Sequence, residues 1–243
     1  MNVQVHDIKC SCCDEIISAG QKKCPSCGTQ VSVSTFNSDN LKSDVSPSAQ
    51  VHDIRCSGCG EAADIGQTKC PSCGNPVLVT TFNSVFSMPM PMVNKYAAEY
   101  RQALEGKPDS KEFNKCIAFC YLKLKLYDKA LAAFEKTIVD NFDDTEIYFY
   151  TAICLLGGKK AFLAQRPEID KIEEYINAAM MIEPKGIYHY FQAYVKYDYF
   201  SRKFFNTSPT YQEALANAKA AGLSPADVDQ FYGILGVERP SVL

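Results

Sequence analysis

The sequence Cys10-Ser-Cys-Cys13, followed by Cys24-Pro-Ser-Cys27, is the strongest structural signal in the chain because it occurs twice. The copy is Cys56-Ser-Gly-Cys59 followed by Cys70-Pro-Ser-Cys73, and each position lies 46 residues after its counterpart. Both sets have the spacing C-x2-C, ten residues, C-x2-C. Four thiolates at this spacing close a tetrahedron around Zn²⁺ and leave no coordination position for a substrate. We therefore predict two structural zinc ions, with the ligands Cys10, Cys13, Cys24, Cys27, Cys56, Cys59, Cys70 and Cys73.

The segments around the cysteines are repeated as well. Residues 5–9, Val-His-Asp-Ile-Lys, recur at 51–55 as Val-His-Asp-Ile-Arg. Each set is followed by an alternating, β-branched stretch, at 31–36 and 77–82, which is typical of a strand. This order of cysteine knuckles and strands resembles the double zinc-ribbon modules of multidomain proteins. The resemblance implies two small β ribbons, each holding one zinc ion.

Three other interpretations of these cysteines are less favoured than two sequential ribbons. Disulfides need an oxidising compartment, and the N-terminal residues show no secretory signal. A redox Cys-x-x-Cys pair stands alone rather than in matched quartets. In a RING-like cross-brace the first and third cysteine pairs would share one zinc, but a duplicated unit is expected to carry a complete site. Cys12 corresponds to Gly58, so it is not a required ligand and is either a tolerated small residue or a reactive thiol. The histidines His6 and His52 are expected to pack over the knuckles.

Charge and composition narrow the class of protein. The chain of 243 residues is 47% hydrophobic and carries a net charge of -3. Residues 1–92 hold six Lys and Arg against eight Asp and Glu, so the ribbons are not basic. Affinity for nucleic acid depends on Lys and Arg contacts to phosphates, and a nucleic-acid partner is therefore not favoured. No run approaches the ~18 apolar residues of a membrane span. Thiolate–zinc sites suit a reducing compartment, and we expect a cytoplasmic protein with no membrane partner.

The pattern of residues divides the chain into five parts. We predict ribbon 1 at 3–38, a linker at 39–48 that is rich in Ser and polar residues, and ribbon 2 at 49–84. A second linker is predicted at 85–92, because the prolines of Met-Pro-Met-Pro prevent a continuous helix, and we expect it to be extended. Residues 93–243 form the last part, an all-α domain with few glycines and helical spacing of apolar residues.

Helical pairs repeat within the all-α domain. Predicted helices at 93–105, 111–125 and 127–140 are followed by a second pair interrupted by an insertion of about eight residues near Gly157-Gly-Lys-Lys160. A weaker third pair is broken at Ser208-Pro209, and Ser224-Pro225 begins a covering helix. Ala118 and Ala130, like Ala152 and Ala179, take the small-residue positions at which paired helices approach. This spacing resembles the tetratricopeptide (TPR) repeat, without its usual Trp.

The TPR resemblance implies a concave groove formed by the first helix of each pair. Such grooves bind peptides or helices of partner proteins. The Lys-Asn-Arg clamp of some TPR families is not expected, because Phe119 and Tyr150 stand where asparagines would be. An apolar, aromatic groove is predicted instead. Its candidate partner-binding residues are Lys115, Phe119, Phe149, Ile153 and His189.

No enzyme motif is complete in the sequence. Gly157-Gly158-Lys159 lacks the earlier glycine and the following Ser or Thr of a phosphate loop, so we interpret it as a lengthened turn. Cys116, Cys120 and Cys154 are expected to be buried, with a metal or redox site as the alternative. We therefore predict a non-enzymatic adaptor that binds proteins and no small-molecule substrate. The alternatives are a zinc-ribbon regulator that binds nucleic acid and, third, a cross-braced, RING-like ligase.

Overall fold

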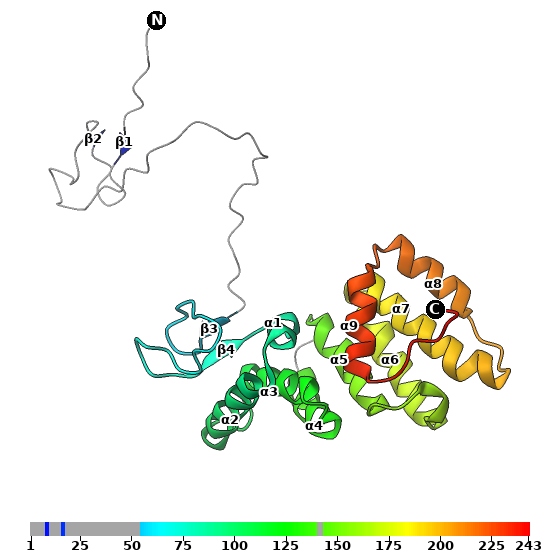
Figure 1. The fold of residues 1–243 in the computed structure, drawn as a ribbon, viewed down its shortest axis with the longest axis horizontal. Helices are drawn as coiled ribbons and strands as arrows, with labels where there is room; N and C mark the ends of the chain where they lie inside the picture. Colours follow the sequence, from blue (N-terminus) through cyan, green and yellow to red (C-terminus); the bar gives the residue numbers. More distant parts are fainter. Residues whose placement is uncertain (1–7, 10–15, 18–53, 140–142) are drawn as a thin grey trace, which may run out of the picture. The chain divides into compact units, whose positions relative to one another are not determined.

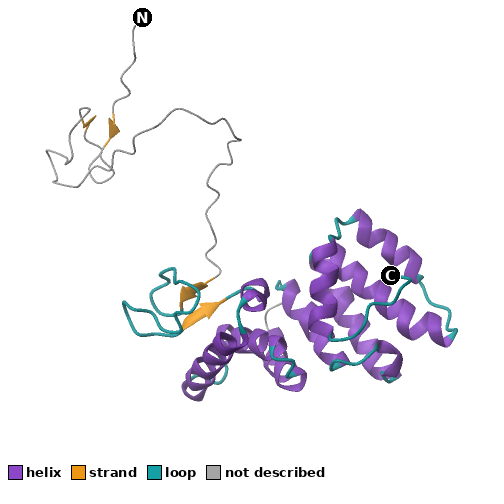
Figure 2. Ribbon diagram, in the orientation of Figure 1, coloured by secondary structure: helices purple, strands orange, loops and turns teal. Residues whose placement is uncertain are grey.

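The computed structural model describes residues 8–9, 16–17, 54–139 and 143–243. The chain divides into two compact units, residues Met1–Gln50 and Val51–Leu243, and each is considered by itself. Figure 1 shows the order of the elements, and Figure 2 shows that helices dominate the second unit. The predicted ligands Cys10, Cys13, Cys24 and Cys27 lie outside the described residues, as do Cys12, His6, His52 and the linker at 39–48.

The described residues of the first unit are β1 (Ile8–Lys9) and β2 (Ile16–Ile17), which pair antiparallel with Lys9 opposite Ile16. In the second unit the equivalent residues, 46 positions later, are Arg55 and Ala62, and they also form an antiparallel bridge. The residues on either side of the first cysteine pair are therefore paired in the same register in both copies. The duplication seen in the sequence extends to the backbone at this point.

Ribbon 2 is built on strands β3 (Ile54–Cys56) and β4 (Val77–Val79), which pair antiparallel with Ile54 opposite Val79. The second knuckle is closed by a bridge between Lys69 and Pro76. Gly74 has φ +73°, the left-handed region that glycine adopts without strain, and its N–H donates to the Cys70 carbonyl. The two turns bring both cysteine pairs to one end of the sheet.

The predicted linker at 85–92 is helical rather than extended, and this expectation is wrong. Helix α1 (Phe82–Ser87) begins inside the predicted ribbon, and α2 (Met90–Gly106) begins two residues after Met88. The apolar residues Phe82 and Val85 are one helical turn apart and are both buried, so burial favours the helix. The prolines interrupt the helical backbone only between α1 and α2. Pro91 lies in the first turn of α2, a position that proline tolerates.

The remaining residues form three helical hairpins and a final helix, as the TPR resemblance predicts. The first hairpin pairs α3 (Lys111–Lys123) with α4 (Tyr127–Ile138). The second pairs α5 (Thr145–Leu156) with α6 (Arg166–Ile182), and the short 3-10 helix η1 (Ala161–Leu163) lies in the predicted insertion between them. The third pairs α7 (Gly186–Val195) with α8 (Tyr211–Ala220), and α9 (Pro225–Leu235) follows.

Small residues allow the hairpin helices to approach. Ala118, Ala130, Ala152 and Ala179 are fully buried, as the repeat pattern predicts. Helix starts also follow the sequence: Ser110 caps α3 through the Phe113 N–H, and Ser224 forms a reciprocal capping box with Asp227 at the start of α9. The sequence signals for hairpins and caps are therefore confirmed.

The first helix of the third hairpin is longer than the other two. After α7 the chain continues through a π-helical turn, η2 (Lys196–Phe200), and a 3-10 turn, η3 (Ser201–Lys203). The first helices of all three hairpins end at a residue with positive φ, namely Lys125, Gly157 and Phe204. The three hairpins thus share one kind of helix termination with three different residues.

Aromatic rings fill the space between the hairpins, α1 and α9. Phe82 of α1 contacts the rings of Phe119 and Tyr150 at 5.8 and 4.7 Å between centroids. Phe231 of α9 lies 5.0 Å from Phe191 and 6.4 Å from Phe149. The side of the hairpins formed by α3, α5 and α7 is therefore covered by α1 and α9.

Candidate metal centre and interaction surfaces

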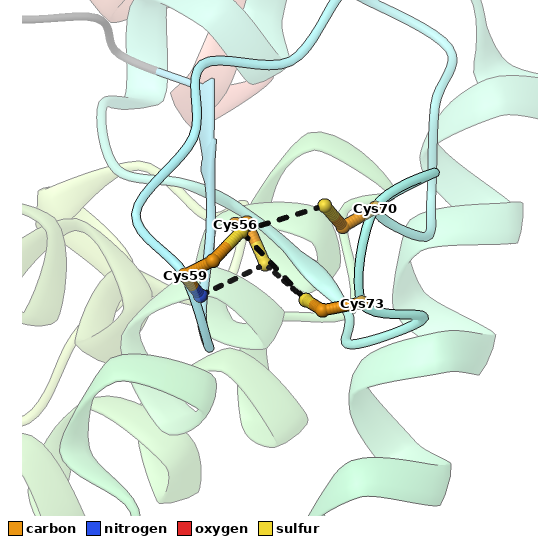
Figure 3. Close-up of side chains that lie close together, drawn as sticks. All are labelled: Cys56, Cys59, Cys70 and Cys73. Atoms are coloured by element: carbon orange, nitrogen blue, oxygen red, sulfur yellow. Dashed lines mark hydrogen bonds between the residues drawn. The ribbon is translucent and has the colours of Figure 1, made fainter.

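Four cysteine sulfurs of ribbon 2 converge at one end of the sheet (Figure 3). Cys56 is the last residue of β3 and Cys59 lies in the turn after it, while Cys70 and Cys73 come from the knuckle before β4. All four sulfurs lie within 4.8 Å of one another, and three of the separations are 3.3, 3.6 and 3.7 Å. A tetrahedron with metal–sulfur bonds of about 2.3 Å has sulfur–sulfur edges of about 3.8 Å. The donor set and its spacing fit a zinc-sized ion.

Backbone groups favour the thiolate form of two of these cysteines. The Cys59 and Gly58 N–H groups donate to the Cys56 sulfur and lower its pKa. The Asn75 backbone N–H, with Cys56 and the Asn75 side chain, lowers the pKa of Cys73 to about 6. Two opposing effects act on Cys59. The Glu61 N–H lowers its pKa, but the neighbouring Cys56 and Cys70 thiols raise it further, so that the pKa of Cys59 rises to about 12. Four thiols this close resist full ionisation, and a divalent ion would compensate that repulsion.

The grouping of the cysteines distinguishes the sequence-level alternatives. A cross-brace would place the pair Cys56 and Cys59 in a different site from the pair Cys70 and Cys73. The structure places both pairs in one cluster, as sequential ribbons require. Over residues 54–139 and 143–243 this quartet is the one group of His, Cys, Asp and Glu with metal-site geometry, so Cys116, Cys120 and Cys154 form no such site.

Ribbon 2 is joined to the helices through hydroxyl groups. The Tyr100 hydroxyl of α2 donates to the Val77 carbonyl at 2.8 Å and accepts from the Val79 N–H at 3.1 Å. Tyr96, one helical turn earlier, bridges Gln67 and Gly66 in the same way. These bonds satisfy backbone groups at the edge of β4 and in the loop before it. The ribbon and the helices share one hydrophobic core.

The cysteines of the helical domain behave as small apolar residues, which confirms that expectation. Cys116, Cys120 and Cys154 are at most 3% exposed, and burial raises the pKa of all three thiols. The Cys116 thiol also donates to the Val79 carbonyl of ribbon 2 at 3.2 Å. Their structural role is core packing, and in the case of Cys116 it extends across the junction with the ribbon.

The predicted groove residues do not line an open groove. Phe119, Phe149 and Ile153 are at most 4% exposed, because α1 and α9 lie over them. Lys115 forms an ion pair with Asp144 at 2.5 Å, and His189 is half-buried with its Nδ1 atom lacking a partner. The expectation of an accessible aromatic groove is therefore wrong for this arrangement. A repeat pattern identifies the concave helices, but it does not reveal which other segments cover them.

What remains of the groove is a cavity of about 160 Å³ between α1, α5, α7 and α9. A larger hollow, of about 930 Å³, lies where the first knuckle of ribbon 2 faces the end of α2 and the start of α3. Leu78 and Phe113 are its apolar floor, and Arg55, Lys107 and Glu112 are charged residues on its lining. The sequence did not indicate this hollow, since it depends on how the ribbon packs against the helices.

Together these features define a class of protein: a stack of helical hairpins that incorporates a four-cysteine ribbon. No protein-family model matches the chain, and no curated protein matches it. A solved structure titled "MamA MSR-1 C2" is similar over 63% of this chain and 75% of that chain, with 17% identity and a TM-score of 0.42. The description of the fold therefore rests on the hairpins themselves. Among the described residues, no helix combines the length and apolar character needed to cross a bilayer.

Proposed function

We propose that the chain is a non-enzymatic, cytoplasmic adaptor that binds proteins, with zinc as a structural ion. The observation that carries this proposal is the all-sulfur cluster built into the edge of a helical-hairpin domain. Four cysteine ligands complete the coordination of Zn²⁺, so the ion would stabilise the fold and activate no water. Its bond energy would hold the two knuckles in place, because their residues bury little apolar surface of their own.

We further propose that each ribbon binds its own ion, giving two zinc ions per chain. The support is the 46-residue repeat of the ligands, together with the shared register of Lys9–Ile16 and Arg55–Ala62. The ligands of the second ion would be Cys10, Cys13, Cys24 and Cys27. Metal analysis of the purified chain tests this number directly.

The surface we assign to a protein partner is the hollow between ribbon 2 and helices α2 and α3. It combines an apolar floor with a charged rim, the usual composition of an interface. Nucleic acid is a less suitable partner, because Lys69, a basic residue beside the second knuckle, already pairs with Glu99 at 3.4 Å. The hollow exists only while ribbon 2 is docked, so zinc would control its shape.

Affinity capture with the full-length, zinc-loaded chain tests this function. The double variant Arg55→Glu/Lys107→Glu alters the rim, and Lys171→Glu on α6 is a matched surface control. We expect specific proteins to be recovered with the wild type and the control and lost with the double variant. Equal recovery by all three would contradict the assignment of the hollow. Recovery of nucleic acid that is released by salt would favour the regulator instead.

A further inference from the structure

The turn at the end of the third hairpin's first helix exposes two phenylalanines. Phe204 is 95% exposed and Phe205 is 51% exposed. The Phe204 N–H donates to the Ser201 carbonyl, and the Phe205 N–H donates to the Phe200 carbonyl, so the two residues close the helix. In Figure 1 this turn projects beyond the helices beside it, at the right-hand edge of the view.

Neither packing nor backbone geometry explains a phenylalanine at position 204. Its φ of +59° lies in the left-handed region, which is strained for every residue with a Cβ atom and which glycine adopts freely. The second hairpin has Gly157 at the equivalent position, and the first has the polar Lys125. A large apolar side chain that is strained and almost fully exposed points to a contact outside the chain.

The surroundings of this turn are basic. The insertion of the second hairpin packs against the extension of the third, where the Phe162 N–H donates to Asp198 at 2.8 Å. Arg202 and Lys203 lie over the Phe162 ring, 4.4 and 5.1 Å from its centroid. Residues 157–168 and 195–207 together hold six Lys and Arg against two acidic residues, in a chain whose net charge is -3.

Part of this positive charge is not compensated. Asp198 is 1% exposed and is held by Arg202 and the Phe162 N–H, so it adds no negative charge to the surface. Lys196 pairs with Glu173, and Arg166 pairs with Asp170. Within the described part of the chain, Lys159, Lys160 and Lys203 have no acidic partner within 4.0 Å. Lys159, Lys160 and Leu163 are exposed.

We propose that this region, residues 159–166 and 196–205, is a docking surface for a bilayer that contains anionic lipids. We call it the aromatic–basic lobe. The exposed phenylalanines would enter the apolar boundary of the bilayer. Lys159 and Lys160, which are exposed, would contact lipid phosphates, and Lys203, over the Tyr199 and Phe162 rings, would add positive charge beside them. Each lysine near such a surface contributes about 1 kcal/mol. An apolar and a charged signal together give reversible attachment, which needs no spanning helix. The sequence predicts no membrane partner because it lacks a spanning segment, and surface attachment of this kind needs none.

Sedimentation with lipid vesicles tests the lobe in the full-length, zinc-loaded chain. The vesicles are phosphatidylcholine alone, or phosphatidylcholine with about a third phosphatidylserine. We expect the wild type to bind the anionic vesicles at least about tenfold more tightly than the neutral ones, with the difference falling as salt rises. Lys159→Gln/Lys160→Gln should weaken binding to anionic vesicles about 30-fold, as two lysines at about 1 kcal/mol each require.

Phe204→Gly separates docking from folding. Glycine suits the left-handed position, so this variant should fold at least as stably as the wild type while its vesicle binding falls about tenfold. Met181→Ala is the matched control, because Met181 is 88% exposed and lies outside the lobe; its binding should be unchanged. Equal binding by the wild type and Phe204→Gly would overturn the proposal. A wild type that does not bind vesicles would overturn it as well. In that case, loss of a captured protein by Phe204→Gly would assign the lobe to that protein.

Discussion

Ribbon 2 has two ends that are stabilised in different ways. At the knuckle end, Cys59 and Cys73 are exposed, and few apolar contacts hold the two turns together. At the sheet end, Val77 and Val79 are fully buried, and the Tyr100 hydroxyl binds the backbone of β4. We propose that the knuckle end depends on an ion held by the four sulfurs, whereas the sheet end packs against the helical domain.

This difference shows why a fold as small as a ribbon can be stable beside a larger domain. A unit of about 35 residues buries too little apolar surface to fold alone, so it needs a metal, a neighbour or both. Ribbon 2 has the neighbour and a four-cysteine cluster that could hold the metal, and the two lie at opposite ends of the ribbon. Removing either support should therefore produce a different and separable failure, which the following substitutions measure.

The largest effect is expected from Cys70→Ser, which removes one of the four proposed zinc ligands. The apparent contribution of such a site is about 10–16 kcal/mol, so the knuckle end should lose its structure and one zinc ion per chain. Helices α3 to α9 should keep their circular dichroism signal. Ser72→Ala, in the same knuckle, is the control and should retain the ion. A variant that still holds the wild-type amount of zinc would contradict the assignment of the ligands.

Phe119→Ala tests how much the buried aromatic rings stabilise the helical domain. Phe119 is fully buried against Phe82, Phe134 and Tyr150, and truncation of such a ring costs about 3–5 kcal/mol. Urea unfolding should show that loss, while Met181→Ala should change the free energy of unfolding by no more than about 0.5 kcal/mol. A cost near zero for Phe119→Ala would mean that the concave side is open, as the sequence alone had suggested.

Tyr100→Phe isolates the sheet end of ribbon 2. It keeps the ring but leaves the Val77 carbonyl and the Val79 N–H without a partner, which costs about 1–3 kcal/mol. Bound zinc should be unchanged, because the knuckles are untouched. Tyr197→Phe, which keeps the contact with the Tyr211 ring, is the matched control and should be nearly neutral. Loss of zinc from Tyr100→Phe would show that the two ends are not separable.

The smallest effect concerns His189 of α7. Burial lowers its pKa below the ordinary value, so the folded state favours the neutral ring. Stability from this group is therefore complete above the unfolded pKa of about 6.5 and declines as the pH falls below it. His189→Gln should show a smaller decline between pH 7.5 and 5 than the wild type in parallel urea titrations. An unchanged pH profile would contradict this account of His189.

The sequence predicted local features better than packing between segments. Ser110 and Ser224 indicated helix starts, and Ala118 and Ala130 indicated a close helical pair, because caps and periodicity are properties of neighbouring residues. The grouping of Cys56 with Cys73 followed from spacing in the same way. The linker at 85–92 was misjudged, since Phe82 and Val85 form a helix in order to be buried against α3.

The covering of the concave side had no signal of its own in the sequence. Phe82 and Phe231 lie far apart along the chain, and nothing in the sequence distinguishes either from an ordinary core phenylalanine. The Tyr96 and Tyr100 hydroxyls, which join ribbon 2 to α2, likewise have no sequence pattern that identifies their backbone partners. Nothing in the sequence around Phe204 indicates the positive φ that the backbone has there.

We propose that an ion holds the knuckles of ribbon 2 while the helical domain holds its sheet. Amide hydrogen exchange of the full-length chain, with and without a zinc chelator, tests this claim most directly. We expect protection to be lost at residues 56–76 and largely retained at β4 and in α3 to α9. Unchanged protection at residues 56–76 would show that no ion stabilises the knuckles. Loss of protection throughout α3 to α9 would show that ribbon and helices depend on the ion as one unit.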